Sequence, residues 1–257
     1  MKRYFTVVSM VCLFALTGIA GTTAQEAQKA NPPTDFKYDL NETCDGVIIQ
    51  RYKGTEMEVV IPAVIEDFPV VEIDYEAFAD CTALTDVRIP RTVTWIDEQV
   101  FIDCTALTRV TLPDTLSVIT WGTFFGCSAL TDIVIPDSVT ALCPIAFSNC
   151  SSLTDIIIPD SVTVLDDAVF SSCTGLTRIT IPSNVTWIGD ESFSGCTNLK
   201  TVIIDSTIVK TIKDNAFENV HADIHFTVKT DAVKAMLKKN TTIRDDQITV
   251  EPNANSL

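Results

Sequence analysis

The sequence is poor in the residues on which catalytic and nucleotide-binding sites most often depend. It has two histidines, His221 and His225, and nine glycines, none of which lies in a phosphate-binding loop motif. Catalysis requires a base, a nucleophile or a metal in a cleft, and no such constellation occurs. The i, i+4 spacing of the histidines would suit zinc on a helix, but their neighbours favour a strand and no third ligand is evident. We therefore expect no enzymatic activity, no cofactor and no metal site.

Positive charge is also scarce. Lysine and arginine together number 18 against 34 acidic residues, which gives a formal net charge of −16. Nucleic acids and anionic membranes are bound through clusters of lysine and arginine, and the sequence contains no such cluster. We expect neither as a partner. The acidity by itself indicates a soluble protein.

Long apolar runs are confined to the start of the chain. Lys2 and Arg3 precede an apolar stretch from Tyr4 to Ala20, which small residues follow as far as Ala24. This order is typical of a secretory signal peptide, predicted to comprise residues 1–24. A membrane anchor is the alternative, and the stretch has about the minimum length for one. Removal of residues 1–24 would leave a net charge of −18, on an exported protein that is secreted, displayed on the cell surface or periplasmic.

A unit of 23 residues repeats through the centre of the chain. Its most regular columns are phenylalanine, cysteine and leucine, and an isoleucine or leucine opens each unit while a proline closes it. The phenylalanines are Phe78, Phe101, Phe124, Phe147, Phe170 and Phe193. The unit can be written I-x4-F-x2-C-x2-L-x2-[VI]-x-[IL]-P, with a degraded last copy around Phe217. Internal repeats of this length are the signature of a solenoid.

The residues between each leucine and its proline predict a short strand. The segment from Leu130 to Pro136 is rich in β-branched residues and alternates towards its end, and the proline lacks the N–H that would continue a ladder. Small polar residues two positions later are expected to hydrogen-bond the backbone of the turn; they are Thr115, Ser138, Ser161 and Asn184. One unit cannot bury its own apolar residues, so the copies must stack with their strands parallel.

On these columns the chain resembles the BspA-like leucine-rich repeats, over roughly residues 46 to 220. The resemblance implies an α/β, β-rich leucine-rich-repeat solenoid of about seven repeats, with a parallel concave sheet and a cap at each end. It also implies a microbial surface or secreted protein that binds host matrix proteins or associates with itself. The predicted organisation is a signal peptide (1–24), a leader and N-terminal cap (25–45), the solenoid (46–220) and a C-terminal cap (221–257).

The two ends of the solenoid depart from the repeat. Residues 25–45 predict a flexible leader and an irregular cap, and the first repeat carries an insertion of five residues between Ala63 and Val70. In the C-terminal cap we predict strands at 224–228 and 248–250 and a short helix at 231–239. Such caps protect the open core of a solenoid.

Eight of the nine cysteines follow residue 24. Stacked strands lie about 4.7 to 4.9 Å apart with equivalent side chains parallel, whereas a disulfide needs converging Cβ atoms about 3.5 to 4.5 Å apart. We therefore predict that the six cysteines of the repeat are small buried thiols. Cys44 and Cys143 stand outside this column, and several rungs should separate them. Cys143 is expected to be exposed, as a reactive thiol or a tolerated substitution.

Side chains between the core positions of each predicted strand point outward. The candidate protein-binding residues fall in three columns, and they are Arg109, Asp132, Asp155 and Arg178 in the first, Val134, Ile157 and Ile203 in the second, and Trp95 and Trp187 in the third. In the first column we expect Arg109 to pair with Asp132, and Arg178 with Asp155, across adjacent rungs. Val134 and Ile157 are adjacent apolar residues at the centre of the sheet, which indicates a contact site or simply β-propensity. Trp95 and Trp187, at the edge after the proline turn, indicate an aromatic contact surface or packing against that edge.

The sequence thus predicts a non-enzymatic protein-binding module, which would act as an adhesin on host matrix or envelope proteins. The alternative is a structural protein that self-assembles through its apolar face. An isolated repeat pattern does not choose between them, because the repeated residues are core residues and the fold alone does not define a function.

Overall fold

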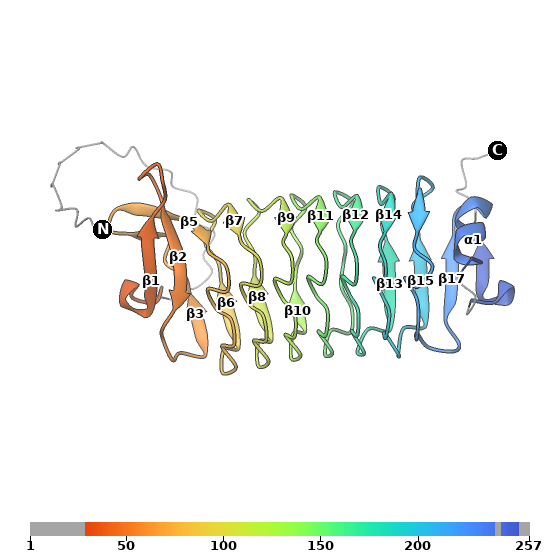
Figure 1. Cartoon of the computed structure of the whole chain (residues 1–257), viewed down its shortest axis with the longest axis horizontal. Helices are drawn as coiled ribbons and strands as arrows, with labels where there is room; N and C mark the ends of the chain where they lie inside the picture. Colours follow the sequence, from red (N-terminus) through yellow and green to blue (C-terminus); the bar gives the residue numbers. More distant parts are fainter. Residues whose placement is uncertain (1–28, 240–242, 252–257) are drawn as a thin grey trace, which may run out of the picture.

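The computed structural model describes residues 29–239 and 243–251. The predicted signal peptide lies outside these residues. The described residues form one row of stacked rungs, each rung being one turn of the chain, with a cap at either end (Figure 1). There are about nine turns, more than the seven predicted, because strands of both caps continue the stack. Within the described ranges, no helix is long and apolar enough to span a membrane.

The predicted strands before each proline form two parallel sheets on one side of the solenoid, which we call the strand face. The first has the order β10-β8-β6-β3 and the second the order β13-β15-β17-β18. The strands are β3 (Glu58–Val60), β6 (Asp86–Arg88), β8 (Arg109–Thr111), β10 (Asp132–Ile133), β13 (Arg178–Ile181), β15 (Thr201–Ile204), β17 (His225–Val228) and β18 (Ile248–Val250). Equivalent residues are paired, as in Asp132 with Arg109, so the predicted phase of the repeat is confirmed.

One rung breaks this ladder. The residues Asp155–Ile158, predicted to be a strand like the others, form none, and the two sheets of the strand face end on either side of them. The prediction of a continuous sheet was wrong at this rung, although its sequence has the same β-branched pattern.

A second ladder, which sequence analysis missed, follows the proline turns. It consists of two-residue parallel strands in the order β16-β14-β12-β11-β9, with β7 paired to β5 in a neighbouring sheet. The strands are β5 (Phe68–Ile73), β7 (Trp95–Ile96), β9 (Val118–Ile119), β11 (Ala141–Leu142), β12 (Val164–Leu165), β14 (Trp187–Ile188) and β16 (Thr211–Ile212). The column of Trp95 and Trp187, predicted to run along an edge, therefore lies on paired strands, with Trp95 in the sheet of β5 and Trp187 in the five-stranded sheet.

The core is a stack of phenylalanine rings. From Phe101 to Phe217, consecutive rings of the column are stacked with centroids 5.1 to 5.5 Å apart. Beside them, the thiol of each buried cysteine donates a hydrogen bond to the carbonyl oxygen of the phenylalanine one rung earlier, with Sγ to oxygen distances of 3.1 to 3.2 Å. Each of these carbonyls also accepts a backbone N–H, as Phe101 does from Cys104. The cysteine column thus combines small volume with a weak second donor to a core carbonyl.

The turn between the two ladders uses left-handed backbone at two positions in each of the six regular repeats, and at one position, Asn219, in the degraded last copy. The position directly before the cysteine is held by residues that accept positive φ, such as Asp103, Gly126 and Asn149. The other position also has positive φ but includes Ile145 (φ 51°), a β-branched residue for which this conformation is costly. Stacking between neighbours therefore imposes the backbone conformation on this rung.

Both caps are regular. The N-terminal cap, predicted to be irregular, contains a 3₁₀ turn (Pro33–Asp35) and an antiparallel pair, β1 (Phe36–Leu40) and β2 (Val47–Tyr52). The insertion in the first repeat forms a tight hairpin of β4 (Val64–Ile65) with β5. Its turn residues Glu66 and Asp67 both have positive φ, as in a type I′ hairpin turn.

At the other end, the predicted strands and helix are confirmed. They are β17, α1 (Asp231–Leu237) and β18, with a 3₁₀ turn (Asp245–Gln247) before β18. Thr230 caps α1 by accepting a hydrogen bond from the N–H of Val233. The strand β17 pairs in register with β15 and places Phe226 in the core, so it is a further rung as well as part of the cap.

Candidate functional site

The predicted apolar pair lies on the strand face and is fully outward. Val134 is 75% exposed and Ile157 is 81% exposed, the highest values among the large apolar residues of the described chain. Their neighbours along the chain, Ile135, Ile156 and Ile158, are buried. Alternation on a pleated backbone therefore places the two side chains in solvent on consecutive rungs. An exposed apolar pair of this kind favours contact with another molecule.

The backbone beside this pair is also unpaired. Within the described chain, the N–H and C=O groups of Asp155–Ile158 make no hydrogen bonds. The nearest link between this rung and the next is a 3.4 Å bond from the N–H of Thr177 to the carbonyl of Thr154. Backbone polar groups are almost always paired in the folded state, so this segment offers donors and acceptors to water or to a partner.

Two hollows flank the apolar pair. One, of about 500 Å³, lies between the rungs of β8 and β10 and is lined by residues that include Arg109, Asp132 and Val134. The other, of about 480 Å³, is lined by all of the unpaired segment together with Arg178 and Thr180 from the next rung. Val134 and Ile157 each form part of one wall. The central rungs therefore present two openings with an apolar side chain beside each.

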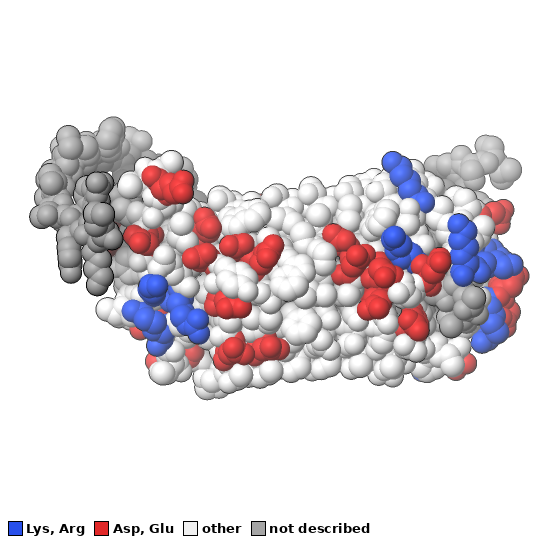
Figure 2. Space-filling view, in the orientation of Figure 1, with Lys and Arg blue, Asp and Glu red and all other residues white. Residues whose placement is uncertain are grey.

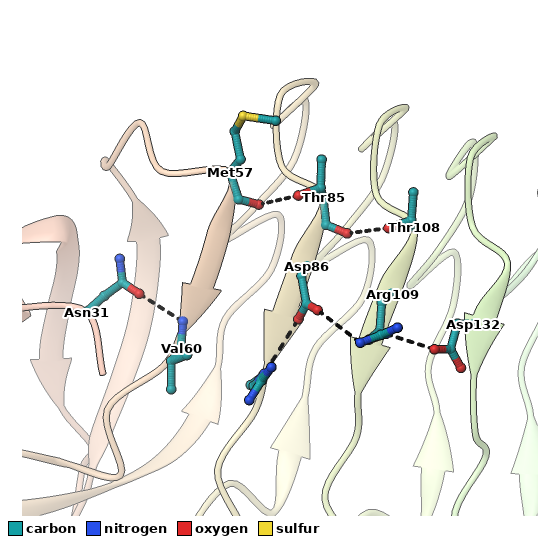
Figure 3. A network of polar contacts seen from close by, with 9 residues as sticks. Asn31, Met57, Val60, Thr85, Asp86, Thr108, Arg109 and Asp132 are labelled. Atoms are coloured by element: carbon teal, nitrogen blue, oxygen red, sulfur yellow. Dashed lines mark hydrogen bonds and ion pairs between the residues drawn. The ribbon is translucent and has the colours of Figure 1, made fainter. Parts of the chain in front are cut away.

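The charged column is only partly paired as expected. Arg109 contacts Asp132, with 2.8 Å between Nε and Oδ2, and lies 3.8 Å from Asp86 on its other side (Figure 3). Arg88 joins the same network through Asp86 at 3.9 Å. The expected partnership of Arg178 and Asp155 does not occur, since these two residues, both described, form no ion pair within 4.0 Å. The missing ladder at Asp155–Ile158 is the physical reason, because it removes the register that would bring them together.

The remaining predicted residues are not gathered at this site. Ile203 is half-buried on β15 between Thr180 and Thr227 of the adjacent strands. Trp95 is 42% exposed, whereas Trp187 is half-buried and lies under the Lys213 ammonium at 5.2 Å from the ring centroid. Four rungs separate the two tryptophans, or roughly 19 Å at the usual strand spacing. They do not form one aromatic surface.

The repeat itself identifies the family. The BspA type leucine rich repeat region matches residues 63–176 and 119–239, with six copies. The chain belongs to this family. No curated protein sequence matches it.

Solved bacterial structures agree with the BspA type repeat. A leucine-rich repeat protein from Bacteroides ovatus is 28% identical with a TM-score of 0.67, and the match covers 76% of this chain and 54% of that one. The Treponema pallidum leucine rich repeat protein is 28% identical with a TM-score of 0.54, covering 88% and 100%. A leucine rich cell surface protein from Faecalibacterium prausnitzii is 33% identical with a TM-score of 0.55, covering 72% and 56%. The chain thus spans about half the length of the first and third of these proteins.

Sequence analysis missed a neutral band on the BspA type solenoid. Acidic side chains gather in two groups on the face seen in Figure 2, and the rungs of β9 and β11 between them carry no charge there. The sequence agrees, since residues 115–154 contain only Asp132 and Asp137 as charged residues. Trp121, which is 37% exposed, belongs to this stretch of the sequence. The signal that was available is the scarcity of charge in two consecutive repeats, which contain two aspartates and no basic residue.

A carboxylate cluster lies near the N-terminal end of the repeats. One oxygen from each of Glu72, Asp74 and Asp97 lies within 4.8 Å of the others. Partial burial, and then the charges of Asp74 and Asp97, raise the pKa of Glu72 above its usual value. The three acids repel one another, and this repulsion opposes folding at neutral pH.

Both histidines and five of the cysteines make side-chain hydrogen bonds within the described chain. His221 accepts a hydrogen bond from the N–H of Asp223 through Nδ1, and His225 bonds Thr249 through Nε2 on β17. Burial raises the pKa of the Cys104 and Cys196 thiols to about 12. The predicted burial is confirmed for five of the six repeat cysteines and is wrong for Cys81, which is half-buried. Cys143 is also half-buried, which corrects the expectation that it is exposed. Cys44 is exposed.

Proposed function

We propose that this chain is a non-enzymatic protein-binding module that acts outside the cytoplasm, with its contact site on the strand face around Val134 and Ile157. The observation that carries the proposal is the coincidence of two adjacent, outward apolar residues with an unpaired backbone segment on the same central rungs. Leucine-rich-repeat proteins typically act as protein-interaction modules, and repeat stacking produces the extended surface that such binding uses.

Export and adhesion belong to the same proposal. The charged, apolar and small-residue order of residues 1–24 supports a secretory signal, and a similar structure is described as a leucine rich cell surface protein. Host matrix proteins and envelope proteins are therefore the first partners to test. The second candidate is self-association of the mature protein, in which the same apolar pair and open backbone would meet those of another copy.

The test is the double variant Val134→Asp with Ile157→Asp. Both side chains point away from the core, so the free energy of unfolding should change by no more than about 0.5 kcal/mol. The double variant should no longer capture purified matrix or envelope proteins. If the protein associates with itself, light scattering should show that the variant is a monomer. A matched control is Val64→Asp with Ile208→Asp, which changes the same residue types at positions 53% and 51% exposed elsewhere on the chain.

The control separates the site from a general effect of charge. Loss of association in the Val134 and Ile157 variant alone supports the proposed site. Equal loss in both variants would indicate that added negative charge, and not the site, weakens binding. Full association by the Val134 and Ile157 variant would move the site elsewhere, with the exposed ring of Trp95 as the next candidate.

A further inference from the structure

We infer that the partner bound at the strand face presents a positively charged segment, whose lysine or arginine side chain enters the hollow beside Ile157. The inference rests on the proposed function and adds the chemistry of the partner. It depends on the charges around the hollow, on the unpaired carbonyls in its wall and on the contrast with the neighbouring hollow.

The charges around the hollow beside Ile157 are mostly negative and uncompensated. Asp137, Asp155 and Asp160 line it, all three are exposed, and none has an ion-pair partner in the described chain. Asp205, also on the wall, is paired with Lys229 at 3.3 Å. The remaining charged group on the wall is the guanidinium of Arg178. Three free carboxylates against one cation favour a positively charged occupant.

The unpaired backbone adds carbonyl oxygens, which are hydrogen-bond acceptors with partial negative charge, to the carboxylates. The carbonyl oxygens of Asp155, Ile156 and Ile157 accept no hydrogen bond within the described chain, and these residues line the hollow. Lysine and arginine side chains offer three and five N–H donors and no acceptor. A basic side chain therefore satisfies carboxylates and carbonyls together, while its methylene stem packs on the exposed Ile157 side chain.

The hollow beside Val134 differs in this respect. Its arginine, Arg109, is held between Asp86 and Asp132, and its other acid, Asp114, is paired with Arg91 at 3.2 Å. The charges there are already compensated, so this hollow offers mainly the apolar contact of Val134. The two openings together fit a segment in which an apolar residue lies close to a basic one.

The experiment uses three capped hexapeptides that alternate valine with arginine, with citrulline or with glutamate. Citrulline keeps the shape of arginine and removes its charge. Binding to the mature protein is measured by calorimetry at low and high salt, and the amide signals of Val134 and Ile157 are followed by NMR. We expect the arginine peptide to shift both signals and to bind at least tenfold more tightly than the citrulline peptide. The difference should shrink as salt increases.

The site is tested with Asp137→Asn plus Asp160→Asn, which should weaken binding of the arginine peptide at least fivefold. Glu191→Gln plus Glu218→Gln, two exposed acids on other turns, remove the same charge and should weaken it less than twofold. Equal weakening by both variants would overturn the inference, because the whole acidic surface would then act. Absence of binding by the arginine peptide, or equal binding by the citrulline peptide, would also overturn it.

This outcome is distinguishable from failure of the proposed function. Val134→Thr with Ile157→Thr removes apolar contact without changing charge. If this variant loses association with a protein partner, and the unsubstituted protein binds the arginine peptide no more tightly than the citrulline peptide, the proposed contact site stands and the inference of a positively charged partner segment is rejected. Unchanged association with a protein partner in this variant would reject the site itself.

Discussion

Replacement of Phe147 by alanine tests the phenylalanine stack at its centre. Phe147 is fully buried, and its ring is stacked on Phe124 at 5.3 Å and on Phe170 at 5.4 Å between centroids. Truncation of a buried phenylalanine costs about 3 to 5 kcal/mol. Loss of two ring contacts, each worth about 0.5 to 1.5 kcal/mol, places the expected cost in the upper part of that range, at about 4 to 5 kcal/mol.

The same change should also weaken cooperativity. In a solenoid each rung contacts only its neighbours, so a defect in the middle uncouples the two halves. Urea unfolding followed by circular dichroism should therefore show a lower midpoint and a smaller m value, as less surface is exposed in each step. Phe125→Ala is the matched control, since Phe125 is half-buried and lies outside the stack; it should cost about 1 to 2 kcal/mol. A loss below about 1 kcal/mol for Phe147→Ala would refute the stacked core.

Two further changes concern stability. Ser161 donates from Oγ to the carbonyl of Val139 at 2.6 Å, so Ser161→Ala should lower the free energy of unfolding by about 1 kcal/mol. The equivalent hydroxyl of Ser138 is buried without a partner, so Ser138→Ala should cost nothing. Equal losses of the two variants in thermal unfolding would contradict this reasoning. The raised pKa of Glu72 means that the folded state binds the proton more tightly, so stability should fall as pH rises from the ordinary glutamate pKa through the raised one. Glu72→Gln should remove that part of the decline and stabilise the protein at neutral pH. An unchanged pH profile would argue against the combined effect of burial and of repulsion by Asp74 and Asp97.

The repeat could be predicted because the core residues of each rung pack against the equivalent residues of the neighbouring rungs. The columns of Phe147 and Cys150 recur with identical spacing, and only stacking buries them all, so phase, core and strand positions follow from the pattern. The outward direction of Val134 and Ile157 follows in the same way, from alternation along a strand. The structure confirms the exposure of both, while their role in binding stays a prediction.

The features that could not be predicted depend on how neighbouring rungs are placed relative to one another. The rung of Asp155–Ile158 has the same β-branched pattern as its neighbours and yet forms no strand, because pairing depends on small displacements between rungs that the repeat does not encode. The hydroxyl of Ser138 lost its expected partner while those of Thr115 and Ser161 kept theirs. The two-residue second ladder was missed because such short strands leave no alternation to detect.

The cysteine column has a consequence for how the chain reaches its folded state. Once folded, the buried thiols point along one line, each held on a phenylalanine carbonyl, and their raised pKa values keep them unreactive. Before folding, the same thiols are accessible at every 23rd residue, and a disulfide between any two would close a loop that the parallel column does not accommodate. In an oxidising compartment, burial of the column therefore competes with oxidation, and faster stacking of the rungs leaves the thiols less time to form disulfides that the folded column does not accommodate.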